Sequence, residues 1–431
     1  MYYYLVLCID KSKMKSSKCD VLIENIGQLL TIPSPGRPIS RISIKSLGII
    51  ENGYVAIKNG RIISVGKGKY RGKVKRSIDA NGGIVLPGFV DPHTHLIFAG
   101  TRAHEFAMRL KGKSYLAIMK EGGGIKSTVK STRSAKKSEL MNIAKRYLDN
   151  ALCWGTTTVE VKSGYGLSTS EELKILEVIA LLQKKHPIDL IPTFLGAHDI
   201  PEEFTNNRGK YVKAILTEML PEIAKRKLAT FCDVFCEKGV FSKADTKKIL
   251  KTASSYGLFA KIHADEFSHT SVCKICKEVD ITTCDHLLYT RIEDLKLMGK
   301  AGTIAVLLPG ANLFLMKRKR PPVDKMRKLG VPIAIGSDFN PGSSPIISMP
   351  VIISLACLLY GLTPEEAIIG ATINAAWAVK KEDEVGSIEP GKFADITIMS
   401  IKNYEELPYW FATNQIKYVL KKGKIVNKRC N

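Results

Sequence analysis

The chain has 431 residues, of which 65 are lysine or arginine and 41 are aspartate or glutamate, so its formal net charge is +24. Hydrophobic residues make up 45% and charged residues 25%, which excludes wholesale disorder and allows a core of normal size. The positive charge suggests a nucleic acid, an anionic membrane or an acidic small molecule as a partner. No apolar stretch reaches the length of a membrane span, so we expect no membrane partner.

The first 18 residues combine a short apolar run with lysines that follow it. The run is too short for a membrane span, and the charges lie on the wrong side for a secretory signal. We therefore expect residues 1–18 to be a disordered leader. Ten cysteines are spread from Cys8 to Cys430 without the dense spacing of a small secreted domain, which favours a cytoplasmic protein.

Short β-strands are expected next, and again at the other end of the chain. Residues 19–30, 53–68 and 76–88 carry β-branched runs interrupted by Asn-Gly and Gly turns, a pattern typical of antiparallel hairpins. Residues 385–400 and 416–428 look similar and include a Lys-Gly turn. We predict one composite β-sandwich that is built from residues 19–86 and 380–431.

Residues 87–379 alternate between strand-like and helix-like segments. Amphipathic segments such as 138–153 and 170–186 have apolar residues at steps of three and four. Eight strands over roughly 290 residues fit a (β/α)₈ barrel better than a doubly wound sheet. The predicted fold class is therefore α/β, a TIM-like (β/α)₈ barrel with a small composite sandwich. The eight strand-length runs are 82–95, 155–166, 188–199, 231–237, 258–266, 281–288, 302–310 and 331–340.

Five of the eight histidines fall at the C-terminal end of a predicted barrel strand, where the active sites of such barrels lie. His93 and His95 form an HxH pair, and side chains two apart on a strand point the same way. His263 and Asp338 end two later strands. Neutral imidazole suits zinc or iron, and three imidazoles with one carboxylate leave room for a water. This pattern predicts a catalytic metal site.

Further polar residues fall on the same predicted rim. Glu266 lies three residues after His263, and His286 ends the next strand, so both are placed for proton transfer. Arg102 follows the HxH loop, and its guanidinium can hold a carboxylate with two hydrogen bonds. The remaining candidates for substrate contact are Tyr165, His198 and residues Asn340 through Ser343.

With these residues assembled, the chain resembles the amidohydrolase superfamily and, within it, the imidazolonepropionase family. The resemblance covers about residues 20–427. The HxH pair, the later histidine and the aspartate indicate the superfamily alone. The segments HEFAMRL, KSGYG and DVFCEKGVF are much more specific for the narrower family.

The resemblance implies metal-dependent hydrolysis of the cyclic amide of 4-imidazolone-5-propanoate to N-formimidoyl-L-glutamate, in L-histidine degradation. It implies a small anionic substrate, a homodimer, and one Zn²⁺ or Fe²⁺/Fe³⁺ per chain. The metal ligands that it implies are His93, His95, His263 and Asp338, and the catalytic residues are Glu266, His286 and Asp338. The implied substrate contacts are Arg102, Tyr165, His198, Glu266, Asn340, Gly342 and Ser343.

Two other functions stay open at this stage. Another mononuclear amidohydrolase, such as a purine or pyrimidine deaminase, would share the metal ligands, but a neutral base would give Arg102 little to bind. A basic nucleic-acid-binding scaffold that has kept a barrel would bind DNA or RNA in a strongly salt-dependent way. No nucleic-acid-binding motif accompanies the charge, so we expect no nucleic acid partner.

Three local patterns are interpreted as structural. The basic run at residues 316–322 is expected to be a solvated face between the seventh and eighth strands. Cys273 and Cys276 form a CxxC without a second pair, which argues against a metal site there. Lys238 lies near the place where dinuclear relatives carry a bridging lysine, but it follows the strand end, which favours a single metal.

Overall fold

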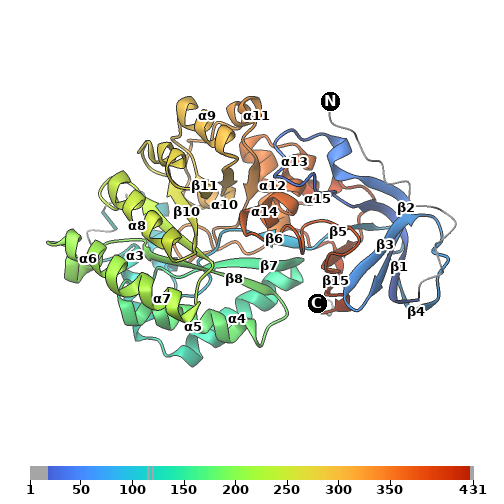
Figure 1. Cartoon of the computed structure of the whole chain (residues 1–431), viewed down its shortest axis with the longest axis horizontal. Helices are drawn as coiled ribbons and strands as arrows, with labels where there is room; N and C mark the ends of the chain where they lie inside the picture. The colour runs from blue at the N-terminus through green and yellow to red at the C-terminus, as the bar shows by residue number, and fades with distance from the viewer. Residues whose placement is uncertain (1–17, 114–116, 119–120, 428–431) are drawn as a thin grey trace.

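The computed structural model describes residues 18–113, 117–118 and 121–427, so the expected leader lies outside the described residues except for Lys18. The chain forms a barrel and a separate sheet beside it, and the sheet contains strands from both ends of the chain (Figure 1). This arrangement confirms the predicted fold class.

The barrel consists of eight parallel strands that neighbour one another in chain order. It closes just beyond the first and last strands, where the N–H of Asp338 donates to the carbonyl of His93 and the N–H of His95 donates to that of Phe339, both at 2.9 Å. The barrel strands are β6 (Phe89–Asp91), β7 (Thr156–Lys162), β8 (Asp189–Ala197), β9 (Phe231–Cys236), β10 (Phe259–Ala264), β11 (Ile281–His286), β12 (Ile304–Leu307) and β13 (Ile333–Ile335).

Helices alternate with these strands and cover the outside of the barrel (Figure 1). For example, α4 packs against β7, α5 against β8 and α8 against β9. The α-helices are α1 (Ala103–Leu110), α3 (Ile125–Ser134), α4 (Lys137–Cys153), α5 (Thr169–Gln183), α6 (Arg208–Ala214), α7 (Leu220–Arg226), α8 (Lys243–Ser255), α9 (Ile292–Ala301), α10 (Pro309–Phe314), α11 (Val323–Leu329), α12 (Met349–Tyr360), α13 (Pro364–Gly370), α14 (Ile373–Ala378) and α15 (Glu406–Tyr409). The 3₁₀-helices are η2 (Ile44–Leu47), η3 (Glu202–Phe204) and η5 (Val272–Lys277), and η4 (Ile215–Met219) is a π-helical segment between α6 and α7.

The second sheet is mixed and joins the two ends of the chain. β14 pairs antiparallel with β5, which fastens the C-terminal segment onto the N-terminal one, while β1 pairs with β2, β4 and β5. Its strands are β1 (Cys19–Leu30), β2 (Ile49–Lys58), β3 (Arg61–Lys67), β4 (Val74–Asp79), β5 (Ile84–Pro87), β14 (Ile396–Met399), β15 (Ile416–Lys421) and β16 (Lys424–Ile425).

Two of the expected turns form hairpins and one does not. Asn59-Gly60 joins β2 to β3, and Lys422-Gly423 joins β15 to β16, with all four residues at the positive φ that such two-residue turns require. Around Asn81-Gly82 the predicted antiparallel hairpin is wrong. Instead, the first half of the twelve-residue β1 pairs with β4 and its second half pairs with β5, and both strands run parallel to it.

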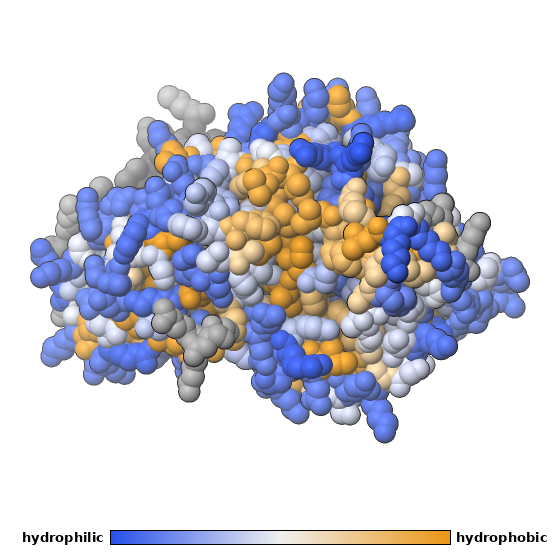
Figure 2. Space-filling model, turned by 180° about the vertical axis from the view of Figure 1, so that it is seen from behind, coloured by the Kyte–Doolittle hydropathy of each residue, from blue (hydrophilic) through white to orange (hydrophobic). Residues whose placement is uncertain are grey.

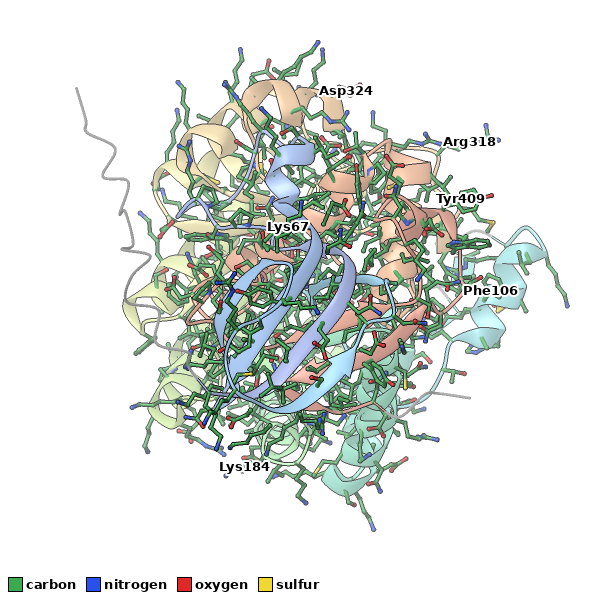
Figure 3. All side chains as sticks on the ribbon, turned by 90° about the vertical axis from the view of Figure 1, so that its right-hand side faces the viewer. Lys67, Phe106, Lys184, Arg318, Asp324 and Tyr409 are labelled. Carbon is green, nitrogen blue, oxygen red and sulfur yellow. The ribbon has the colours of Figure 1, made fainter. Side chains whose placement is uncertain are left out.

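Charged side chains are distributed around the molecule. Lys184 and Arg318 point outward at opposite edges in Figure 3. Figure 2 shows hydrophilic residues around the outline of one face, with hydrophobic side chains gathered near its middle. Among the described residues, no helix combines the length and the apolar character needed to cross a membrane.

Candidate metal centre and substrate site

Five histidines and one aspartate meet at the C-terminal end of the barrel strands. His93 and His95 follow β6, His198 follows β8, and His263 and His286 lie at the ends of β10 and β11. Asp338 Oδ1 lies 3.5 Å from the Nε2 atoms of both His93 and His95. His263 Nε2 lies 3.3 Å from His95 Nε2. Among the described residues, the possible metal donors form two groups that share His93. One holds His93, His95 and Asp338, and the other holds His93, His263 and His286.

The donors in this cluster fit a divalent cation. His93 Nε2 is buried and has no hydrogen-bond partner among the described residues, a situation that costs free energy unless something binds the nitrogen. Burial lowers the pKa of His93 and of His95 well below the ordinary value, so both rings are neutral and can donate a lone pair. Three imidazoles and one carboxylate are a ligand set that suits zinc or iron.

Two buried carboxylates hold the histidine rings from behind. Asp285 Oδ2 lies 2.5 Å from His93 Nδ1, and Asp233 Oδ2 lies 2.9 Å from His263 Nδ1. Each contact fixes the ring so that Nε2 faces the cluster, an arrangement that is common around ligating histidines. Burial lowers the pKa of His263, but the contact with Asp233 outweighs it and raises that pKa above the ordinary value.

A buried ionic network lies behind these carboxylates. Lys162 Nζ lies 2.8 Å from both Glu160 Oε1 and Asp233 Oδ2, and 3.9 Å from Asp285 Oδ2. Lys261 Nζ lies 3.1 Å from the same Glu160 oxygen. Burial lowers the pKa of Lys162, but Asp233 and Glu160 outweigh it and raise that pKa. Two ammonium groups against three carboxylates nearly balance the charge of this fully buried layer.

Sequence reasoning missed this network, although the sequence carries a signal for it. Glu160 and Lys162 lie two apart in β7, and Lys261 and His263 lie two apart in β10, within strands that are otherwise apolar or Thr-rich. Charged side chains at this spacing point to one side of a strand, so they meet inside a barrel.

Two site residues have strained backbones. Asp338 has φ +52° and His286 has φ +74°, in the left-handed region that side chains other than glycine seldom adopt. Such strain costs about 1–3 kcal/mol and gathers at functional sites.

Burial, together with the nearby charge of Glu266, raises the pKa of Asp338 to about 8.

Glu266 lies between a histidine and a lysine. Its Oε2 is 3.6 Å from His286 Nε2, and its Oε1 accepts a hydrogen bond from Lys317 Nζ at 2.8 Å. Burial raises the pKa of Glu266, but His286 and Lys317 outweigh it and lower that pKa to about 2. Burial lowers the pKa of His286 to about 3. At neutral pH Glu266 is therefore a carboxylate and His286 a neutral ring.

Lys317 corrects the interpretation of the basic run at residues 316–322. Its side chain is only 17% exposed, and its Nζ also lies 3.8 Å from the ring centre of Phe267. The run follows β12, and the loops after barrel strands lie on the active-site side of the barrel. One member of the run is therefore part of the site instead of a solvated face.

Tyr165 and His198 lie beside His95. The His95 and His198 rings stack with centroids 4.9 Å apart, and the Tyr165 ring lies 5.4 Å from His198. His198 Nδ1 donates a hydrogen bond to the carbonyl of Gly164 at 2.9 Å. Burial lowers the pKa of His198 to about 3, so the ring is neutral and its Nε2 can accept a hydrogen bond.

Arg102 is held against the loop after β13. A Cβ at Gly342 would lie 2.0 Å from Arg102 Nη1, so this glycine makes room for the guanidinium. On another side, Arg102 Nε donates to Glu105 Oε2 at 2.9 Å. Arg102 and Asn340 line one pocket of about 350 Å³ together with the rings of Phe98, Phe106 and Phe339.

Asn340 and Ser343 shape the loop around Asp338. Asn340 Oδ1 accepts hydrogen bonds from the N–H groups of Gly342 and Ser343, both at 2.8 Å. The Ser343 hydroxyl donates to Asp338 Oδ2 at 3.3 Å. Every residue expected at the site thus lies on this rim, and Asn340 and Ser343 also support Asp338.

Two other histidines, Lys238 and the two cysteines of the CxxC lie outside this cluster. His186 pairs with Asp149, and His269 pairs with Asp294. Lys238 is exposed. Cys273 and Cys276 are free thiols.

The chain is similar to known proteins over almost its whole length. A model of the amidohydrolase family matches residues 84–426. An imidazolonepropionase from Alkaliphilus metalliredigens is 46% identical over 412 residues, which cover 94% of this chain and 98% of the relative. One from Geobacillus kaustophilus is 44% identical over 414 residues, covering 94% and 97%. The crystal structure of an adenosine deaminase from Xanthomonas campestris with bound zinc matches with a TM-score of 0.71 at 18% identity, over 95% and 93% of the two chains, and shows the fold alone.

Proposed function

The chain belongs to the amidohydrolase family, which is metal-dependent, and from that premise we propose that it hydrolyses 4-imidazolone-5-propanoate to N-formimidoyl-L-glutamate. The observation that carries this proposal is identity of 43–46% to imidazolonepropionases along nearly the full length of both chains. The rim geometry agrees with it, because Arg102 can take an anionic propanoate tail.

We assign one metal ion, zinc or iron, to His93, His95, His263 and Asp338. The bound cation would supply Lewis acidity, and it would lower the pKa of a water to about 7, so that the water can act as a nucleophile at neutral pH. Asp285 and Asp233 keep the ligating faces of His93 and His263 turned toward it.

The substrate is held by residues around this centre. Arg102 pairs with the propanoate carboxylate, and Tyr165 and His198 lie beside His95, where they can contact the ring and its tail. Glu266 carries its negative charge at neutral pH and accepts a hydrogen bond from a ring N–H. Asn340, Gly342 and Ser343 close the site on the side of the last barrel strand.

Hydrolysis adds water to the ring carbonyl carbon and breaks its bond to the ring nitrogen. The water loses a proton and the departing nitrogen gains one, so carriers are needed between the two. Asp338, whose pKa burial raises, accepts the first proton, and Glu266 with His286 completes the transfer to nitrogen.

The direct test is a turnover assay on purified, metal-replete protein, with metal analysis on the same sample. We expect consumption of imidazolone propanoate, formation of N-formimidoyl-L-glutamate and about one metal ion per chain. Folded, metal-loaded protein that leaves the substrate intact would refute the proposal.

Arg102 separates this activity from that of a base deaminase. Replacing Arg102 with methionine should raise KM about 10–100-fold with little change in kcat, because a charge-assisted pair with the substrate carboxylate contributes about 1.5–3 kcal/mol. Steady-state kinetics measure the effect, and Arg226→Met, at a partly exposed ion pair with Glu177, is the control. An unchanged KM would count against the carboxylate clamp.

Metal affinity should depend on pH. The pKa of Asp338 is about 8, so binding a cation below that pH must release a proton. The apparent affinity should fall about fivefold from pH 8 to pH 7, and more steeply at lower pH once His263, whose pKa is also raised, carries a proton. Competition with a chelator at each pH measures this, and a flat profile would contradict it.

We also propose that the enzyme works in the cytoplasm as a homodimer. Large apolar side chains on α12 and around α15 are unusually exposed, as at Leu358 with 67% and Tyr409 with 74%, which a second copy could cover. Light scattering on the full chain tests the dimer.

A further inference from the structure

The turn of residues 164–167 carries Tyr165 into the site. Gly164 has φ +103°, and a Cβ there would lie 2.9 Å from His198 Nδ1. A Cβ at Gly166 would lie 2.5 Å from the backbone of Glu171 and Glu172. The turn is therefore packed too closely for side chains at its glycines, and its position depends on what binds its backbone.

The N–H groups of the turn are bound by one carboxylate. Glu172, in the first turn of α5, is fully buried. Its Oε2 accepts from the N–H of Gly164 at 3.0 Å, and its Oε1 accepts from the N–H groups of Gly166 and Leu167, both at 2.8 Å. Three backbone donors on one buried carboxylate fix the conformation of the turn.

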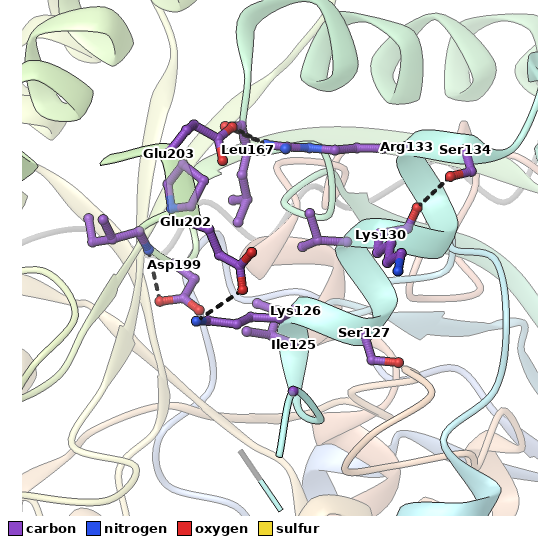
Figure 4. Close-up of a pocket in the computed structure, with 14 residues that line it drawn as sticks. Ile125, Lys126, Ser127, Lys130, Arg133, Ser134, Leu167, Asp199, Glu202 and Glu203 are labelled. Carbon is purple, nitrogen blue, oxygen red and sulfur yellow. Dashed lines mark hydrogen bonds and ion pairs between the residues drawn. The ribbon is translucent and has the colours of Figure 1, made fainter. Parts of the chain in front are cut away.

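The carbonyl groups of the same turn are bound by a guanidinium. Arg133, from α3, donates to the carbonyl of Gly166 at 2.6 Å and to that of Leu167 at 3.2 Å. It also pairs with Glu203 Oε1 at 2.8 Å, as Figure 4 shows at the edge of a pocket of about 520 Å³. An anion therefore holds the N–H side of the turn and a cation holds its carbonyl side.

We propose that Glu172 and Arg133 are positioning residues, which together hold the turn so that Tyr165 and His198 are set to bind the substrate. The link to His198 is direct, because the carbonyl of Gly164 accepts its Nδ1–H and so presents Nε2 to the site. Because the turn is already ordered before the substrate binds, binding does not include the entropic cost of ordering the turn. The inference rests on the proposed function, which places Tyr165 and His198 among the substrate contacts.

The test compares Glu172→Gln and Arg133→Met with two controls. Glu172→Gln would turn an amide N–H₂ toward backbone donors, so KM for imidazolone propanoate should rise about tenfold or more, while kcat and metal content stay within about threefold. Arg133→Met should raise KM several-fold, and because Arg133 is partly exposed it keeps the test valid if Glu172→Gln does not fold. Glu171→Gln and Arg226→Met, whose side chains form other, partly exposed ion pairs, should leave both constants unchanged.

A second readout does not depend on turnover. Long-range ¹H–¹⁵N spectra of the metal-loaded full chain report the tautomer of His198, which should be protonated at Nδ1 in the wild type and mixed in Glu172→Gln. Folded variants that keep the wild-type KM and the wild-type tautomer of His198 would overturn the inference. The same holds if the variants lose thermal stability while the KM and the tautomer stay as in the wild type, because the two residues would then have only a structural role. If the wild-type protein does not turn over the substrate, the proposed function fails. The tautomer measurement still tests whether Glu172 holds the turn that orients His198.

Discussion

Replacing Asp338 with asparagine is expected to remove the bound metal and to lower turnover by about three orders of magnitude or more. Asp338 Oδ1 lies 3.5 Å from Nε2 of both His93 and His95, and it is the one carboxylate among the four proposed ligands. A Lewis acid contributes several kcal/mol to such a reaction, and each 1.4 kcal/mol is about a factor of ten in rate.

Asparagine keeps the shape of the side chain, so the barrel should still fold. Elemental analysis and turnover on the same preparation measure the two effects, and circular dichroism checks the fold. Asp324→Asn is the matched control, since that side chain is 83% exposed on α11 and should keep both metal and activity. An Asp338→Asn protein with a full complement of metal would show that the ligand set is wrong.

Replacing Glu266 with glutamine should lower kcat about 10²–10⁴-fold while leaving the metal in place. Glu266 is not among the proposed metal ligands, but it lies 3.6 Å from His286 and is negatively charged at neutral pH. A glutamine of the same size cannot take a proton, so the loss would measure proton transfer. If kcat stays within a factor of three, Glu266 binds the substrate without carrying a proton.

Replacing Lys317 with methionine should change how activity depends on pH. Lys317 is one of the groups that hold the pKa of Glu266 at about 2, so its loss should raise that pKa. The carboxylate would then be protonated at a higher pH on acidification, and the acid limb of kcat/KM should move upward. Lys319→Met, in the same basic run, is the control.

Much of the site could be read from local sequence. The period of two along a strand places His93 and His95 on one side, and the position of His263, His286 and Asp338 at strand ends brings them to one rim. Barrel topology makes those inferences safe, because every parallel strand ends on the same side. The hairpin at Asn59-Gly60 could also be predicted from local sequence, because a two-residue turn needs positive φ at both positions and Asn-Gly adopts it readily.

Other features depend on contacts between distant segments. Whether Asn81-Gly82 made a hairpin depended on β1, more than fifty residues earlier, which pairs with both flanking strands. Lys317 looked like one lysine in a basic run until the loop after β12 brought it to Glu266. No local pattern distinguishes a solvated lysine from a partly buried one with a carboxylate partner.

The sequence by itself determined the barrel, a small β-rich unit built from both ends of the chain, the family and the residues expected at the rim, because these follow from strand periodicity, strand ends and short motifs. The parallel pairings that make the terminal sheet mixed were decided by the tertiary structure. Only the tertiary structure decided how the rim is supported. It brought Lys162 and Lys261 together with three buried carboxylates, set the pKa of Asp338 by burial, and placed Glu172 and Arg133 on either side of one turn. Hydrogen bonds, charge pairing and burial depend on distances between atoms from different strands and helices, and those distances exist only in the folded chain.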